Sequence, residues 1–201
     1  MEAGCFAPWL LFGPADARLS ACLALIPDVL ARGRQVLVLV PELSQAEPLR
    51  EAMERKLGAA VAVLHGQQPG SLREAEWLRA RSGEAKIVIG PRSAIFAPLE
   101  SPGLFVVWDE SDEAYVQADS PAYDARRGAW MAAEARRSLL VFGADAPTVE
   151  AFHHARAGGY LVPLPSGAPE RRAAEIVDDR GVRGLVAPRV LERLGAAIGR
   201  K

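Results

Sequence analysis

The feature that most constrains the fold of this chain is a series of short, uninterrupted apolar runs separated by helical stretches. Each run is continuous rather than alternating, and several are rich in β-branched residues, as expected of strands covered on both faces. Strands that alternate with helices form a parallel sheet with helices on both of its faces. The sequence therefore predicts a three-layer α/β domain with strands at WLLF (9–12), VLVLV (36–40), VAVL (61–64), IVI (87–89), LFVV (104–107) and LLVF (139–142).

Short motifs predict where the helices begin and where one is interrupted. Ser44-Gln-Ala-Glu47 and Ser71-Leu-Arg-Glu74 each have the form of a capping box. Ser120-Pro121 resembles an N-cap followed by proline at the first helical position. Pro27 lies inside the first helical stretch, and we expect a kink or a break there.

The regular alternation of apolar runs and helical stretches ends near residue 162. Residues 163–170, PLPSGAPE, are typical of a linker. A short strand candidate at 175–178 and a helix from about 187 to 198 follow. We therefore expect one domain over 1–162 and, over 163–201, a linker and connector helix leading toward a further domain.

Composition and charge exclude several classes of function. The net charge of −1 argues against a polycation that coats nucleic acid, so any DNA contact has to be a local patch. No apolar run approaches the roughly 18 residues of a membrane span, and no export signal is visible at the N-terminus. Cys5 and Cys22 form no metal-binding pair, and the three histidines have no partner at a recognisable spacing. We expect a cytoplasmic protein with buried thiols and no metal site.

The first loop lies where a nucleotide-binding α/β protein carries its phosphate loop, which reads G-x-x-x-x-G-K-[ST]. Here the register gives Gly13, Arg18, Leu19 and Ser20. Gly13 and Ser20 fit, but Arg18 replaces the second glycine and Leu19 replaces the lysine that binds the β and γ phosphates. Asp16 adds a negative charge to the loop. The loop is therefore interpreted as a degenerate phosphate loop that binds no nucleotide.

An acidic segment follows the fifth apolar run. Trp108-Asp109-Glu110-Ser111-Asp112 has the form of a Mg²⁺-binding helicase motif, or else of an acidic, solvated loop after a buried strand. Because the phosphate-binding lysine is missing, the second interpretation is favoured.

Two further segments carry candidate nucleic-acid contacts. Arg92 and Ser93 lie just past a strand end, where they could hold a phosphate; alternatively Arg92 pairs with a carboxylate and Ser93 caps a helix. Between 115 and 130, Tyr115, Tyr123 and Arg126 are spaced as side chains that stack on single-stranded bases. The alternative for the second segment is a set of core contacts made by Tyr123, Trp130 and Met131.

Several strings, read in order, resemble the first RecA-like helicase lobe of the PriA family, the bacterial primosomal replication-restart proteins. They are LVLVPEL (37–43), AVLHG (62–66), EWLRARSGEAKIVIGPRSAIFAPL (76–99) and GLFVVWDESDEAYVQ (103–117), with further similarity at 122–126 and 142–147. The resemblance covers nearly the whole chain and implies that 163–201 leads into a second lobe.

The departures from the family pattern all fall on nucleotide-facing motifs. The family's GVTGSGKT becomes GPADARLS at 13–20, and its GSATP becomes GADAP at 143–147. Its DEEH falls on Trp108, Asp109, Glu110 and Ser111, so that Trp108 takes the place of the metal-binding aspartate. A shift of register to Asp109 would move the carboxylate by about 3.4 Å and to the other face of the strand. Pro91 replaces the threonine of GTRSA.

This pattern resembles a degenerate branch of the family that lacks helicase activity. It implies a non-catalytic lobe with no cofactor of its own, whereas intact members use ATP and Mg²⁺ here and hold zinc in a C-terminal region. The implied partners are forked or single-stranded DNA and other primosome proteins. The expected DNA contacts are Arg92, Ser93, Tyr115, Tyr123 and Arg126. The alternatives are a 3′–5′ ATP-driven helicase lobe with atypical motifs and a structural spacer without DNA contact.

Overall fold

A computed structural model describes residues 6–165 of the chain. The strand predicted at 175–178 and the helix predicted at 187–198 lie outside the described residues. No helix in 6–165 is long and apolar enough to cross a membrane.

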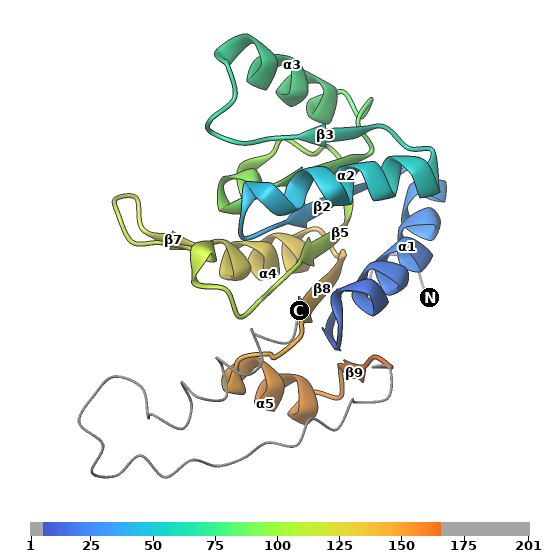
Figure 1. Cartoon of the computed structure of the whole chain (residues 1–201), viewed down its shortest axis with the longest axis vertical. Helices are drawn as coiled ribbons and strands as arrows, with labels where there is room; N and C mark the ends of the chain where they lie inside the picture. The colour runs from blue at the N-terminus through green and yellow to red at the C-terminus, as the bar shows by residue number, and fades with distance from the viewer. Residues whose placement is uncertain (1–5, 166–201) are drawn as a thin grey trace, which may run out of the picture. The chain divides into compact units, whose positions relative to one another are not determined.

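The described domain is built around a parallel sheet of seven strands in the order β3-β4-β2-β5-β8-β1-β9 (Figure 1). Every adjacent pair in it is parallel, as the alternation of strands and helices predicts. All six predicted strands are present, and a seventh forms one edge. The strands are β1 (Ala7–Phe12), β2 (Gln35–Leu39), β3 (Val61–Val63), β4 (Ile87–Gly90), β5 (Pro102–Val107), β8 (Leu139–Ala144) and β9 (Leu161–Pro163).

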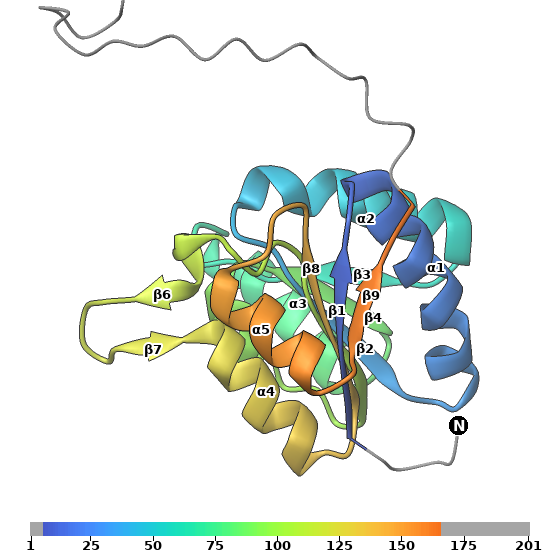
Figure 2. The same cartoon turned by 90° about the horizontal axis from the view of Figure 1, so that it is seen from below.

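Helices cover both faces of this sheet, and a small hairpin projects from it (Figure 2). The hairpin consists of two short antiparallel strands, β6 (Val116–Gln117) and β7 (Tyr123–Asp124). The helices are α1 (Ala15–Ala31), α2 (Leu43–Leu57), α3 (Gly70–Arg81), α4 (Ala125–Ala135) and α5 (Val149–Ala157), with 3-10 turns η1 (Arg92–Phe96) and η2 (Glu113–Tyr115).

The central strands are apolar throughout because both of their faces are covered. In β2, Val36 and Val38 pack into a cluster with α1 and α2, whereas Leu37 and Leu39 pack on the opposite face with residues of α3 and α4. Successive strand residues point to opposite faces, so a continuous apolar run supplies both layers at once. Full burial of one such side chain contributes about 1.5–3 kcal/mol.

The predicted helix starts are wrong in detail although the helices exist. Ser44 and Ser71 are the second residues of α2 and α3, whose N-caps are Glu42 and Pro69 without side-chain capping bonds. Local capping preference is worth about 1 kcal/mol, which packing of the adjoining residues overrides.

The two proline predictions also differ from the structure. Ser120-Pro121 precedes the helix by several residues, and its peptide bond is cis. We expected a kink or a break at Pro27; helix α1 continues through it without a break, and this proline is exposed.

The sheet extends past the predicted boundary at 162. Pro163 lies opposite Phe12 in the pairing of β9 with β1, and the backbone N–H of Leu164 donates to the Phe12 carbonyl at 2.7 Å. Edge strand β9 has only three residues, which is too short to give a clear apolar run in the sequence.

Candidate functional site

The carboxyl ends of β1, β5 and β8 meet at one edge of the sheet, where open α/β proteins bind their ligands. Here β1 is followed by only two residues, Gly13 and Pro14, before α1 begins at Ala15. Gly13 has a φ of +151°, and its N–H donates to the Ala144 carbonyl at 3.0 Å. The N–H of Arg18 donates to the Pro14 carbonyl at 3.0 Å. A segment that wraps a phosphate in other proteins is therefore folded into the first turns of a helix.

The Arg18 side chain is buried at this edge with 3% of its surface exposed. Its Nε donates to the Gly13 carbonyl at 3.0 Å, and its Nη1 donates to Asp109 Oδ1 at 2.6 Å and to the Trp108 carbonyl. The guanidinium also lies over the Trp108 ring, 5.1 Å from its centroid. One cation thus ties the loop after β1 to the end of β5, and we call this arrangement the Arg18 clasp.

The clasp depends on a glycine in the neighbouring strand. A Cβ on Gly143 of β8 would lie 2.8 Å from the Trp108 carbonyl oxygen and 3.2 Å from Arg18 Cδ. A larger residue would force the Trp108 carbonyl to shift, since a contact of 2.8 Å is essentially never seen for a real Cβ, and the Arg18 side chain would have to give by a few tenths of an ångström.

The other loop positions also have their contacts within the protein. Leu19, at the position of the family's lysine, packs against the α1–α2 core cluster. The Ser20 hydroxyl donates to the Asp16 carbonyl in its own helix at 2.8 Å. Asp16 lies in the first turn of α1, where its negative charge interacts with the positive end of the helix dipole and opposes an incoming phosphate.

Asp109 and Glu110, which follow β5, are bound to protein groups, so the interpretation as a solvated loop is wrong for these two residues, whereas Ser111 is exposed. Asp109 belongs to the Arg18 clasp. Glu110 is 4% exposed; its Oε1 accepts the backbone N–H of Thr148 at 2.6 Å, and its Oε2 lies 3.3 Å from the Thr148 hydroxyl. The Glu110 carboxylate therefore holds the start of α5 against the end of β5.

A second feature of the same edge is a cavity of about 360 Å³ that we call the edge groove. Arg92 and Ser93 both line it. Arg92 Nη1 donates to the Ala114 carbonyl at 3.0 Å, so this arginine binds a backbone oxygen rather than the carboxylate of the alternative interpretation. Ser93 lies inside η1, whose N-cap is Pro91, and does not cap it. The groove is lined by Pro41, Leu43, His65, Gly66, Gln67, Pro91, Arg92, Ser93, Ala114, Gln117 and Tyr123.

Tyr115 does not have the accessible ring that base stacking requires. It is 0% exposed, and its hydroxyl donates to the Leu39 carbonyl at 2.9 Å. Burial raises the pKa of this phenol above its usual value. The prediction of a stacking contact is wrong at this position, because η2 turns the ring inward onto the core of the sheet.

Tyr123 differs because it lies on the projecting hairpin and is only partly buried. Its ring meets that of Phe96 edge to face, with centroids 5.2 Å apart. Phe96 is 62% exposed, and the sequence interpretation did not include it. The available signal was a large apolar residue at the end of the GPRSAIF string, outside any strand. Tyr123 lines the edge groove, and the exposed ring of Phe96 packs against it.

Arg126 is largely committed to the protein itself. Its Nη2 pairs with Asp124 Oδ2 at 2.7 Å, and its Nη1 donates to the Glu110 carbonyl at 2.8 Å. Its guanidinium therefore has fewer free N–H donors for a DNA phosphate than the predicted contact requires.

The residues that the alternative interpretation places in the core differ in their burial. The Trp130 ring contacts Phe6 with centroids 5.2 Å apart, as a core interpretation expects. Met131 is 64% exposed and is not a core residue.

The fold places the chain in a class shared with helicase domains of the RecA-like type. The C-terminal domain of S. cerevisiae Dbp5 L327V, bound to Gle1 H337R and IP6, matches with a TM-score of 0.55 and 16% identity over 79% of this chain and 90% of that one. A Pyrococcus furiosus Hef helicase domain matches with a TM-score of 0.51 and 14% identity, over 69% of this chain and 28% of that one. At these identities the likeness concerns the fold alone.

Sequence comparison defines the family more closely. Replication restart protein PriA of Bacillus subtilis is 32% identical over 183 residues, which cover 87% of this chain and 23% of that protein. PriA of Treponema pallidum is 36% identical over 171 residues, covering 83% of this chain and 26% of that protein. The chain therefore belongs to the PriA family of replication restart proteins. It spans about a quarter of the length of these relatives, and no family model matches it.

Proposed function

We propose that this chain is a non-catalytic helicase-like lobe that contributes DNA binding and contacts with other replication proteins in replication restart. The observation that carries the non-catalytic part is the Arg18 clasp. The Arg18 guanidinium donates hydrogen bonds to the carbonyl of Gly13 and to the carboxylate of Asp109. It lies at the edge of the sheet where the β and γ phosphates and Mg²⁺ would bind.

Opening this edge for a nucleotide would carry a large energetic cost. Moving the Arg18 guanidinium away would leave the carboxylate of Asp109 and the carbonyls of Gly13 and Trp108 without their donor. A buried group that loses its partner costs about 1–3 kcal/mol, and a charged group costs more. The phosphates would gain no lysine in return, because Leu19 packs into the core.

We predict that Mg²⁺-ATP does not stabilise the chain. A ligand at a hundred times its dissociation constant stabilises by about 2.7 kcal/mol, which would raise the melting temperature by several degrees. Differential scanning fluorimetry with Mg²⁺-ATP, and with Mg²⁺ alone as the reference, measures this difference. The Leu19→Lys variant restores the lysine of the phosphate loop. It should still not hydrolyse ATP, because Arg18 and Trp108 remain. A nucleotide-dependent shift in the parent, or steady-state hydrolysis by this variant, contradicts the proposal.

The edge groove supports the DNA-binding part of the proposal. Arg92 and Ser93 line a concave surface, and the pair of Tyr123 and Phe96 offers accessible aromatic rings beside it. A positive side chain that contacts phosphate and an aromatic ring that stacks on a base are the usual elements of a single-strand binding surface. Because the net charge is only −1, the affinity of this chain alone should be weak and should depend on this local patch.

We predict that Arg92→Ala and Tyr123→Ala weaken DNA binding in different ways. Loss of Arg92 releases about one counterion fewer, so the dependence of affinity on salt becomes shallower. Loss of the Tyr123 ring costs about 1–3 kcal/mol with the salt dependence nearly unchanged. Fluorescence anisotropy on labelled forked DNA at several salt concentrations measures both effects, with Arg92→Lys as the charge-preserving control. Equal affinities and equal salt dependences for all variants would make the lobe a spacer.

A further inference from the structure

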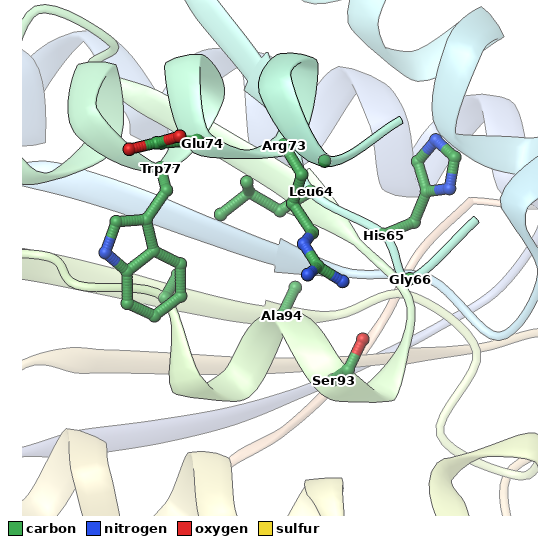
Figure 3. Close-up of a pocket in the computed structure, with 10 residues that line it drawn as sticks. Leu64, His65, Gly66, Arg73, Glu74, Trp77, Ser93 and Ala94 are labelled. Atoms are coloured by element: carbon green, nitrogen blue, oxygen red, sulfur yellow. The ribbon is translucent and has the colours of Figure 1, made fainter. Parts of the chain in front are cut away.

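A second cavity adjoins the edge groove on the side of α3 (Figure 3). It has a volume of about 560 Å³, and we call it the α3 pocket. His65, Gly66 and Ser93 line both the edge groove and the α3 pocket, so the two form a continuous path along the carboxyl ends of β3 and β4. The α3 pocket is lined by Leu64, His65, Gly66, Gly70, Arg73, Glu74, Trp77, Ser93, Ala94 and Ala97.

Polar groups in this pocket are free to bind a ligand. Arg73 extends from α3 toward the turn that carries Ser93 and Ala94 (Figure 3). Among the hydrogen bonds and ion pairs of residues 6–165, none involves the Arg73 guanidinium or the Ser93 hydroxyl. Arginine and serine in this arrangement match the donors that commonly bind phosphate oxygens.

The pocket also has an aromatic lining residue, Trp77, which follows Arg73 by one turn on α3. Trp77 is 41% exposed and presents its ring beside Leu64 and Ala94 (Figure 3). The one carboxylate in the lining, that of Glu74, lies on the Trp77 side of the pocket, away from Ser93 and His65. An exposed tryptophan on a helix costs solvation energy unless something covers it, and a nucleobase is a flat group of matching size.

Hydrogen bonds fix the backbone of the segment between the two cavities, and the space beside Gly66 is open. The backbone N–H of His65 donates to Gln68 Oε1 at 3.1 Å, and Gln68 Nε2 donates to the Val63 carbonyl at 2.8 Å. His65 Nδ1 is buried and has no hydrogen-bond partner among the described residues. A Cβ built on Gly66 meets no atom within 4 Å, so this position faces open space.

We propose that the α3 pocket binds one nucleotide of a single DNA strand that continues from the edge groove, with its base on Trp77 and its phosphate on Arg73 and Ser93. This inference rests on the proposed DNA-binding function and extends it to a specific subsite. A single strand is required, because a base in a duplex has both faces covered by its neighbours. The continuity of the pocket with the edge groove favours a nucleic acid over an acidic peptide, since a strand would bind both cavities in succession.

The test uses the 201-residue chain and fluorescein-labelled oligodeoxythymidylate, followed by anisotropy at several salt concentrations. Trp77→Ala should weaken binding about 5- to 100-fold without changing the salt dependence, and Trp77→Phe should restore part of the affinity. Arg73→Gln should weaken binding and make the slope of log K against log salt shallower by about 0.7. Gly66→Glu leaves the core unchanged and places a carboxylate in the path, so it should also weaken binding.

The outcomes separate this inference from the proposed function. If the parent does not bind oligodeoxythymidylate at low salt, both the proposed function and the subsite fail. If Arg92→Ala and Tyr123→Ala weaken binding while Trp77→Ala, Arg73→Gln and Gly66→Glu bind like the parent, the groove is retained and the α3 pocket is overturned. Binding of a Glu- and Asp-rich peptide that Trp77→Ala abolishes, with DNA binding unchanged, would equally overturn the subsite.

Discussion

At the scale of single residues, Arg18 has the largest consequence for this molecule because its guanidinium joins segments that are 91 positions apart in the chain. Its side chain supplies hydrogen-bond donors to two carbonyls and a carboxylate, and its planar face covers the Trp108 ring. Lysine cannot reproduce this arrangement, because an ammonium group has neither the planar face nor the fixed fork of donors.

We predict that Arg18→Ala lowers the free energy of unfolding by about 2–3 kcal/mol. Removing one partner of a fully buried ion pair costs about 3–5 kcal/mol, and the smaller figure reflects that a quarter of the Asp109 side chain is exposed to solvent. Arg18→Lys should fall between the parent and Arg18→Ala. Urea unfolding followed by circular dichroism measures the difference. A stability equal to that of the parent would mean that the clasp contributes nothing to the fold.

At the scale of elements, the helix starts show how tertiary contacts decide among several local signals. Helix α4 begins after Asp124, whose Oδ1 accepts the backbone N–H of Arg126 at 2.8 Å. Partial burial alone would raise the pKa of Asp124, but the hydrogen bonds and positive charge of Arg126 lower it below its usual value. Asp124 is therefore both the cap of α4 and the partner of Arg126.

We predict that Asp124→Asn destabilises the chain near neutral pH and that this difference disappears in acid. Since the folded state lowers the pKa of Asp124, its charge contributes stability above the unfolded pKa of about 4. That contribution is lost as the pH falls through the lower folded pKa. Asp124→Ala should cost about 1 kcal/mol more at every pH, because it also removes the cap, whereas asparagine keeps it. Thermal unfolding of the three proteins from pH 7 to pH 3 measures both effects, and a difference that persists unchanged to pH 3 contradicts the role of the charge.

At the scale of the whole molecule, the parallel sheet gathers the candidate residues at one edge. The Arg18 clasp lies at the ends of β1, β5 and β8, and the edge groove and the α3 pocket lie beside the ends of β3 and β4. All strands of the sheet run in one direction, so every loop that follows a strand opens on this side. One edge thus carries both the Arg18 clasp and the surface proposed to contact DNA.

The sequence by itself determined the class of the fold, six of the seven strands and the family. The apolar runs are local patterns, and burial of both strand faces requires them whatever the neighbouring strands are. The sequence also shows Leu19 and Trp108 at the positions where the family resemblance implies a lysine and an aspartate.

Only the tertiary structure decided what each polar and aromatic side chain contacts. Tyr115 reaches the carbonyl of Leu39, and Arg18 reaches Asp109, because the sheet brings together segments that are far apart in the chain. The sequence pattern predicts DNA contacts at Tyr115, Tyr123 and Arg126 alike, yet Tyr115 is buried, Tyr123 is partly exposed and Arg126 is paired with Asp124. Spacing along a chain fixes which residues share a face of one element, but the partner of that face depends on long-range packing, which no local pattern encodes.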